Sequence, residues 1–376
     1  MRIVVVGATG NVGTAVLRRL AAVRADGDGD AGGRDAVGPD AAGRDGGGRD
    51  ATGRDATGVQ IVGVARRLPD LRAEPYDAAV WHAVDVGAAD AVDQLAAVFQ
   101  GADAVIHLAW ALQPTHDIPV QYRTNVTGTA NVLAAVARAE VPQVVVASSV
   151  GAYRGVDVDG KRTPVDESWP TDGIPTATYS IHKAANEAAM DAFEADHPAV
   201  TVTRLRPGLI FQRDAAAEIR GLFLGHLVPM SIVRWIRWLV LPLPYPFVFQ
   251  AVHADDVADA YWRAVDRRAA GAFNIAATPV LNPPRLARAF GMLGAVRIPL
   301  GLLRGIVTLT WRLRLQPTDA GWIDIAAGVP IMRTDRARSV LGWEARHTSE
   351  EALRALVAGF ADGANVPGSG SGPLRG

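Results

Sequence analysis

A glycine-rich turn close to the N-terminus restricts the fold of this chain more than any other feature. The apolar run at residues 3–6 predicts a buried strand, and residues 7–13 (GATGNVG) join it directly to a helix. Glycines in such a turn let backbone N–H groups approach a pyrophosphate, which the helix N-terminus also favours. We therefore predict a dinucleotide-binding site here, with a simple strand-to-helix turn as the alternative. Its residues are Gly7, Thr9, Gly10, Asn11, Val12 and Gly13.

Short apolar runs alternate with amphipathic stretches over the first half of the chain. We expect strands at residues 59–64, 81–84, 104–107, 143–148 and 200–205, and helices at 88–99, 120–139 and 177–196. Strands separated by helices form parallel sheets with right-handed crossovers. The sequence therefore predicts an α/β fold, a doubly wound parallel sheet (Rossmann) with a smaller, mostly helical C-terminal substrate lobe.

Changes in composition predict the domain organisation. Residues 1–206 are expected to form the dinucleotide-binding domain and residues 207–363 the substrate lobe, with residues 251–277 returning to the Rossmann sheet. Residues 25–58 consist almost entirely of Gly, Asp, Arg and Ala in imperfect GRDA repeats, and such a segment cannot offset the entropy of ordering. We expect a disordered insertion there and a flexible tail at residues 364–376.

Composition also restricts the partners of the chain. It has no cysteine, which excludes disulfides and thiolate metal sites, and its histidines show no metal-ligand spacing, so we predict no metal. The net charge of −1 gives no reason to expect nucleic acid. Residues 3–6 are too short for an export signal, and no uninterrupted apolar run reaches the ~20 residues of a membrane span. We expect a cytoplasmic protein without an integral membrane span.

Two arginines follow the strand expected at residues 59–64, where the adenosine ribose of a bound dinucleotide would lie. Arg66 and Arg67, with no carboxylate beside them, suit a 2′-phosphate. The sequence thus favours NADP over NAD, with NAD as the alternative and solvated surface charges as the plainer interpretation. Asp85 and Val86, after the third strand, are expected near the adenine.

Tyr179 and Lys183 are four residues apart and therefore share one face of the helix expected at 177–196. An ammonium beside the phenol would lower the tyrosine pKa from its usual ~10 toward neutrality, and it could also bind the nicotinamide ribose. Ser149 follows the strand at 143–148, where its hydroxyl could bind a substrate oxygen. A helix surface pair and a capping serine are the alternatives.

Taken in order, these motifs resemble the extended short-chain dehydrogenases/reductases and, more narrowly, the NAD-dependent epimerase/dehydratase family. The residues that carry the resemblance are 7–13, His107-Leu108-Ala109, 125–129 (NVTGT), Ser148-Ser149, Tyr179 with Lys183, Arg206-Pro207-Gly208, 252–258 (VHADDVA) and Leu341-Gly342-Trp343. The resemblance implies Ser149, Tyr179 and Lys183 as the catalytic triad. It also implies that Leu108, Ala109 and Asn125 line the cofactor, and that Pro207 and Gly208 flank the nicotinamide.

The resemblance further implies a homodimer formed by the helices at 120–139 and 177–196. One departure concerns the substrate. Nucleotide-sugar members of the family carry an arginine for the diphosphate just before the segment that matches Val329-Pro330, whereas residues 325–328 are IAAG here.

The leading hypothesis is hydride transfer between nicotinamide and a secondary alcohol or ketone, a small-molecule substrate, with Tyr179 as the acid/base. The net reaction would be reduction or epimerisation. A non-catalytic NAD(P)-binding sensor or interaction protein is an alternative, because fold does not fix function. A membrane-associated reductase of a lipid-like substrate is another, since interfacial helices interleave basic and apolar residues. The arginines that suggest it are Arg297, Arg304, Arg312 and Arg314.

Overall fold

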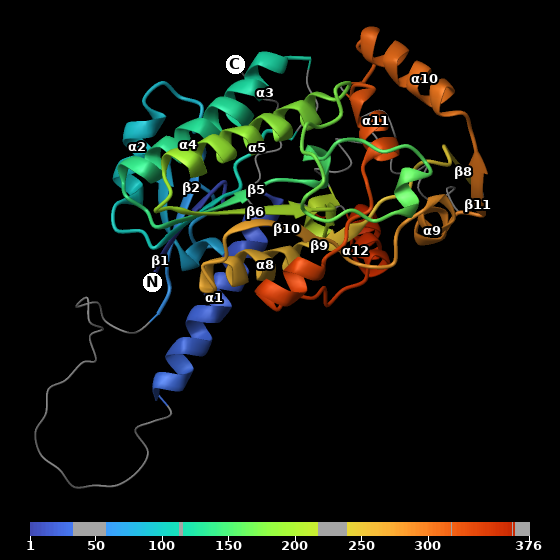
Figure 1. Ribbon diagram of the computed structural model, residues 1–376. Coiled ribbons are helices and arrows are strands. Elements are labelled where there is room, and N and C mark those ends of the chain that lie inside the picture. The colour runs from blue at the N-terminus through green and yellow to red at the C-terminus, as the bar shows by residue number, and fades with distance from the viewer. Residues whose placement is uncertain (33–57, 113–115, 217–238, 317, 363, 365–376) are drawn as a thin grey trace, which may run out of the picture.

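The computed structural model describes residues 1–32, 58–112, 116–216, 239–316, 318–362 and 364 (Figure 1). Its centre is a seven-stranded sheet with the strand order β10-β6-β5-β4-β1-β2-β3, in which all neighbouring strands are parallel. The strands are β1 (Arg2–Val6), β2 (Gln60–Ala65), β3 (Val80–Ala83), β4 (Ala104–His107), β5 (Gln143–Ala147), β6 (Thr201–Pro207) and β10 (Gly271–Ile275).

The direction in which the chain builds the sheet reverses between β1 and β4. The strands β2 and β3 lie on one side of β1, whereas β4, β5 and β6 lie on the other. In open α/β sheets, ligands bind in the crevice that such a reversal opens at the carboxyl ends of the strands. The predicted doubly wound parallel sheet is confirmed, and the glycine-rich turn after β1 lies at this crevice.

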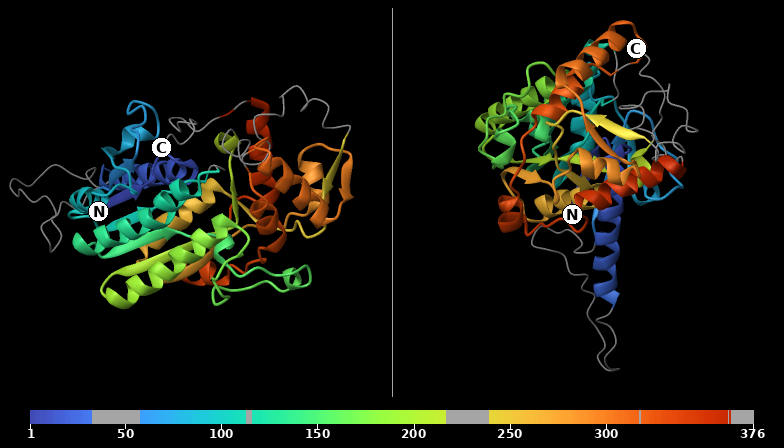
Figure 2. Two further views of the ribbon diagram at one scale, coloured as in Figure 1. Left: turned by 90° about the horizontal axis from the view of Figure 1, so that it is seen from above. Right: turned by 90° about the vertical axis from the view of Figure 1, so that its right-hand side faces the viewer.

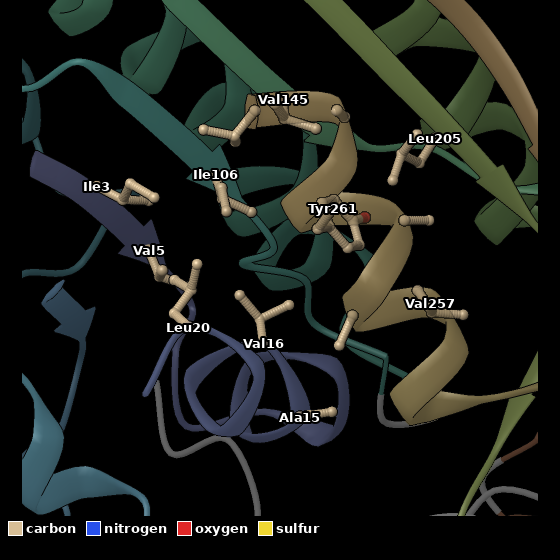
Figure 3. Close-up of a cluster of buried hydrophobic side chains, with 14 of the residues drawn as sticks. Ile3, Val5, Ala15, Val16, Leu20, Ile106, Val145, Leu205, Val257 and Tyr261 are labelled. Carbon is tan, nitrogen blue, oxygen red and sulfur yellow. The ribbon is translucent and has the colours of Figure 1, made fainter. Parts of the chain in front are cut away.

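Helices cover both faces of the sheet because its central strands are apolar on both sides. Ile3 and Val5 of β1 pack with α1 and α8, as Figure 3 shows for part of this cluster. Val4 and Val6 point the other way and pack with α2, α4 and α5. Side chains alternate across a strand, so one apolar strand supplies two cores. These helices are α1 (Asn11–Gly32), α2 (Ala91–Phe99), α4 (Gly128–Arg138), α5 (Thr178–Asp196) and α8 (Ala254–Asp266).

The helix expected at residues 120–139 is divided in the structure. It begins as α3 (Ile118–Tyr122), continues through a π-helical turn at Arg123–Thr127, and then becomes α4. Such π-helical turns often occur at functional sites. This one carries Asn125, one of the residues expected near the cofactor.

Apart from β10 and α8, which belong to the sheet and its helical cover, most of the described chain after β6 builds a smaller lobe beyond the carboxyl ends of the strands (Figure 1). It contains two small parallel pairs, β7 with β9 and β8 with β11. The strand β11 was not expected within the mostly helical stretch 281–363, because it gains its pairing from a segment far away in sequence. The elements are β7 (Leu209–Phe211), β8 (Val240–Leu243), β9 (Ala251–His253), β11 (Gly294–Arg297), α9 (Pro283–Ala289), α10 (Leu300–Arg312), α11 (Gly321–Gly328) and α12 (Ser349–Asp362).

The last turns of α1 project beyond the sheet (Figure 2). This helix continues to Gly32 and so enters the segment 25–58, where a disordered insertion was expected. Residues 33–57 of that segment, and residues 365–376 of the expected tail, lie outside the described residues. Over the part of the chain that the structure describes, no helix is long and apolar enough to cross a membrane.

Candidate active site

A cavity of about 240 Å³ lies at the crevice, beneath the C-terminal lobe. Its wall is formed by the glycine-rich turn, by the segments that follow β4, β5 and β6, and by side chains of α5, α8 and α11. Residues that the sequence assigned to catalysis and to cofactor binding therefore meet in one place. Those that line the cavity are Gly7, Gly10, Asn11, Val12, Gly13, Leu108, Ser149, Tyr179, Lys183, Pro207 and Gly208.

The glycine-rich turn forms one end of the cavity. Gly7 has a φ of +84°, and a Cβ at this position would lie 2.5 Å from the backbone nitrogen of Ala109. A Cβ on Gly13 would overlap the carbonyl oxygen of Gly7, so neither position accepts a side chain. At Gly10 the nearest atom to a Cβ would be 3.5 Å away, so this residue has its free side toward the cavity. Because α1 begins directly after it, at Asn11, the first amides of that helix have no acceptor within the helix.

Ser149 and Tyr179 bring two hydroxyl groups together in the middle of the cavity. Ser149 directly follows the loop at the end of β5, and Tyr179 lies in the first turn of α5. The side chains of these two residues are hydrogen-bonded to each other. Ser149 Oγ also accepts a hydrogen bond of 3.0 Å from the N–H of Gly151. Ser149 therefore caps a short turn, as its plainer interpretation suggested, and also contacts Tyr179.

Lys183 is buried one helical turn after Tyr179. Its Nζ donates a hydrogen bond of 2.6 Å to the carbonyl oxygen of Ala147 and lies 3.5 Å from the centroid of the Trp110 ring. The same atom is 5.9 Å from the centroid of the Tyr179 ring. Burial lowers the pKa of Lys183 to about 7, and the charge of Glu187 opposes this shift. The nearest partners of this ammonium are therefore Ala147 and Trp110.

The expected lowering of the Tyr179 pKa is wrong for this structure. Burial raises the pKa of Tyr179 to about 12, and its hydrogen bond with Ser149 opposes the shift. The residue keeps part of its surface exposed, but its ring packs against two tryptophan rings in the cavity wall, where a phenolate would lose hydration. The ammonium of Lys183 is engaged elsewhere and does not compensate. At neutral pH the phenol is therefore protonated and is a proton donor.

A buried ion pair, which sequence reasoning missed, lies beside Ser148 and Lys183. Glu187 lies one turn beyond Lys183 on α5 and accepts two hydrogen bonds of 2.8 Å from Arg206 of β6. It also accepts a hydrogen bond from Ser148, which precedes Ser149. Burial acts to raise the pKa of Glu187, but the hydrogen bonds and charge of Arg206 outweigh it, so this pKa lies below its usual value. The four-residue spacing from Lys183 is the only sequence signal for Glu187.

Three residues predicted to contact the cofactor lie outside the cavity wall, namely Thr9, Ala109 and Asn125. Asn125 instead holds the segment after β4: its Oδ1 accepts a hydrogen bond of 2.7 Å from the N–H of Ala111, and its Nδ2 donates one of 3.2 Å to the carbonyl of the same residue. Asn125 therefore positions the neighbouring Trp110, while Ala109 packs against Gly7.

The residues expected at the adenosine also lie away from this cavity. Arg66 and Arg67 are exposed immediately after β2. Asp85 accepts a hydrogen bond from Gly87, in a turn, and lies 3.5 Å from a guanidinium nitrogen of Arg123. Val86 is buried. All four follow β2 or β3 and hence lie at the same sheet edge as the glycine-rich turn. Among the described side chains, no group of three or more His, Cys, Asp or Glu could hold a metal ion.

Two tryptophans that the sequence did not single out flank Tyr179. Trp110 follows β4, and its ring centroid is 5.4 Å from that of Tyr179, with the planes at 71°. Trp322 of α11 lies 5.1 Å from the same ring, tilted by 41°. The sequence could have pointed to Trp110 as a site residue, because it directly follows Leu108-Ala109. No sequence feature points to Trp322, because α11 reaches the cavity only through the packing of the C-terminal lobe.

Fold and cavity together define a Rossmann-type α/β protein with a site at the switch point of its sheet. The chain belongs to the NAD-dependent epimerase/dehydratase family, whose family model matches residues 53–276, and it is therefore an enzyme. This confirms the family that the order of the sequence motifs predicted. No curated protein matches the chain.

Several solved structures share the fold at low sequence identity. A protein named gox2253 aligns with a TM-score of 0.66 and 18% identity over 96% of this chain and 98% of its own. UDP-glucose 4-epimerase from Thermotoga maritima, solved with UDP-glucose, aligns with a TM-score of 0.62 and 17% identity over 96% of this chain and 99% of its own. MoeE5 in complex with UDP-glucuronic acid and NAD aligns with a TM-score of 0.59 and 19% identity over 96% of this chain and 100% of its own. At these identities the likeness concerns the fold.

Proposed function

We propose that this enzyme transfers a hydride between a nicotinamide cofactor and a secondary alcohol or ketone, with Tyr179 as the acid/base. The observation that carries the proposal is the meeting of Ser149, Tyr179 and Lys183 in a cavity whose other end is the glycine-rich turn. The nicotinamide, when bound, takes up or returns the hydride. The net reaction is either a reduction or, if the keto intermediate is reduced again, an epimerisation.

The residues of the cavity suit the separate tasks of this reaction. The amides at the start of α1 and the open side of Gly10 suit a pyrophosphate. The Ser149 hydroxyl would hold the substrate oxygen, and Tyr179, protonated at neutral pH, would give its proton to the alkoxide formed from a ketone. Lys183 would bind the ribose of the cofactor. It would also take part in returning a proton to Tyr179 after Tyr179 has given its own to the alkoxide. Pro207 and Gly208, at the end of β6, would flank the nicotinamide.

The choice between NADP and NAD is a finer part of the proposal. The family and the complexes of its structural relatives point to NAD, whereas Arg66 and Arg67 favour a 2′-phosphate. Titration of the wild type and of the double variant Arg66→Ala/Arg67→Ala with NADH and NADPH distinguishes a preference for NADP from a preference for NAD. A selective loss of NADPH binding in the double variant supports NADP, and equal affinities in both proteins would remove that preference.

The general test is deuterium transfer from labelled NADH or NADPH across a panel of ketones. Transfer to at least one ketone supports the enzyme. Tight cofactor binding without any transfer would instead favour the non-catalytic sensor.

The domain limits at residues 206 and 207, the cytoplasmic location and the homodimer remain predictions.

A membrane-associated reductase is a second candidate because α10 leaves an apolar stripe exposed. None of its residues is buried, and Leu302, Ile306, Leu309 and Leu313, which share one face at helical spacing, are each at least half exposed. Interfacial helices combine such a stripe with basic residues, here Arg312 and Arg314. Flotation with vesicles that contain anionic lipid tests this candidate. Absence of co-flotation would eliminate it.

A further inference from the structure

The Tyr179 ring is flanked by aromatic side chains from both parts of the molecule. Trp110 comes from the Rossmann sheet and Trp322 from the C-terminal lobe, and both rings lie within 5.4 Å of the Tyr179 ring, centroid to centroid. A third side is closed by Gly151, where a Cβ would lie 2.8 Å from the Tyr179 ring. A substrate ring that lies beside Tyr179 would therefore be close to two indoles.

The described wall of the cavity contains a single charged side chain, Lys183. Its ammonium already has two partners, the Ala147 carbonyl at 2.6 Å and the Trp110 ring at 3.5 Å. The remaining wall on the substrate side is apolar, with Leu112, Ile210 and Ile325 beside the tryptophans. Burying a diphosphate against such a wall would be strongly unfavourable, because a buried charge needs a charged or hydrogen-bonding partner.

We infer that the substrate end of this cavity takes an uncharged secondary alcohol or ketone on a flat, apolar ring system. The inference rests on the proposed function. In the oxidative direction, the alcohol carbon loses a hydride to the oxidised nicotinamide and the hydroxyl group loses its proton to Tyr179, which leaves a ketone. Stacking on Trp110 and Trp322 holds the ring while Ser149 holds the oxygen.

The indoles also explain why a flat ring is favoured over a branched aliphatic chain. Aromatic pairs prefer offset or edge-to-face contact at centroid distances of about 4.5–7 Å, and such contacts stabilise the pair beyond the effect of the apolar area that it buries. Trp110 is held in place by the two hydrogen bonds between Asn125 and the adjacent Ala111, and by the contact of its ring with the Lys183 ammonium. The wall is therefore prepared before the substrate arrives, which reduces the ordering cost of binding.

Calorimetric titration tests the inference with two probes, 2-acetylnaphthalene added to the enzyme saturated with the oxidised cofactor and UDP-glucose added to the enzyme saturated with NADH, so that neither pair can exchange a hydride. We expect the naphthyl ketone to bind and UDP-glucose neither to bind nor to compete. Trp322→Ala should weaken naphthyl ketone binding about tenfold, whereas Trp322→Phe, which keeps an aromatic face, should restore most of it. Trp169→Ala is the matched control, because Trp169 lies outside the cavity wall, and it should leave this affinity unchanged.

Tighter binding of UDP-glucose than of the ketone, or equal ketone affinity in the wild type and Trp322→Ala, would overturn the inference. The titration with NADH that precedes each experiment tests the proposed function separately. If NADH binds and UDP-glucose is turned over in a Tyr179-dependent reaction, the hydride-transfer proposal stands and only the substrate class is wrong. Failure to bind either NADH or NADPH would overturn the proposed function itself.

Discussion

The two ends of the cavity are built in different ways. The glycine end consists of backbone from one short segment, in which Gly7 and Gly13 allow the close approach of neighbouring main chain. The aromatic end consists of side chains from elements far apart in sequence, such as Trp110 after β4, Tyr179 on α5 and Trp322 on α11. The first end depends on the absence of side chains, and the second on the exact packing of large ones.

The largest effect on stability is expected near the aromatic end, where Glu187 and Arg206 form a buried pair. Glu187→Ala leaves the buried guanidinium groups of Arg206 and Arg204 without this carboxylate and should lower the free energy of unfolding by about 3–5 kcal/mol in urea denaturation. The matched control is Asp93→Ala, which breaks the exposed pair with Arg138 and should change stability by less than about 1 kcal/mol. Equal effects of the two substitutions would contradict the role given to the buried pair.

The same pair predicts how stability depends on pH. The pKa of Glu187 is lower in the folded chain than its unfolded value of about 4.3. Its contribution is therefore fully present above that unfolded pKa and is lost as the pH falls through the lower folded pKa. Urea denaturation of Glu187→Gln between pH 7 and pH 3 should show a shallower loss of stability than the wild type. Parallel curves would show that Glu187 does not titrate with folding.

The structure and the sequence-based expectation differ in the pKa that they give Tyr179, and its ionisation can be measured. Because burial raises its pKa to about 12, the ligand-free enzyme should show no Tyr179 phenolate below about pH 10. The measurement is the phenolate absorbance of the wild type minus that of Tyr179→Phe during an alkaline titration. A difference signal that develops near neutral pH would instead mean that the Lys183 ammonium controls the phenol.

At the glycine end, Gly10→Ala should weaken NADH binding about tenfold while leaving stability nearly unchanged. The new methyl would meet only ordinary contacts within the protein, the nearest at 3.5 Å, but would occupy the open side of the turn. Fluorescence titration with NADH and urea denaturation give the two quantities. If the affinity is retained, the pyrophosphate does not lie at this turn.

The smallest effect is expected at Asn125, whose hydrogen bonds to Ala111 position Trp110. Asn125→Ala should reduce kcat/KM a few-fold and leave NADH affinity unchanged, since neutral hydrogen bonds contribute about 0.5–1.5 kcal/mol each. A selective rise of the NADH dissociation constant would instead place Asn125 at the cofactor, as the sequence suggested.

The contrast between the two ends also explains how far the sequence could be interpreted. The parallel sheet and the glycine turn were predictable, because β1 is apolar on both faces and residues 7–13 form one contiguous motif. The Tyr179/Lys183 pair was predictable from its spacing, but the sign of the Tyr179 pKa shift was not. That sign depends on Trp110 and Trp322, which α5 meets only in the folded chain. The pairing of β8 with β11 was missed for the same reason.

Replacement of the Tyr179 hydroxyl tests the central claim most directly. Tyr179→Phe keeps the ring between its two indoles and removes only the group that would carry the proton. We expect kcat/KM for a responsive ketone to fall by about 10²–10⁴, as is typical for loss of a general acid, while the NADH dissociation constant stays within about threefold of the wild type. A Phe variant that reduces the ketone at the wild-type rate would show that the proton comes from elsewhere.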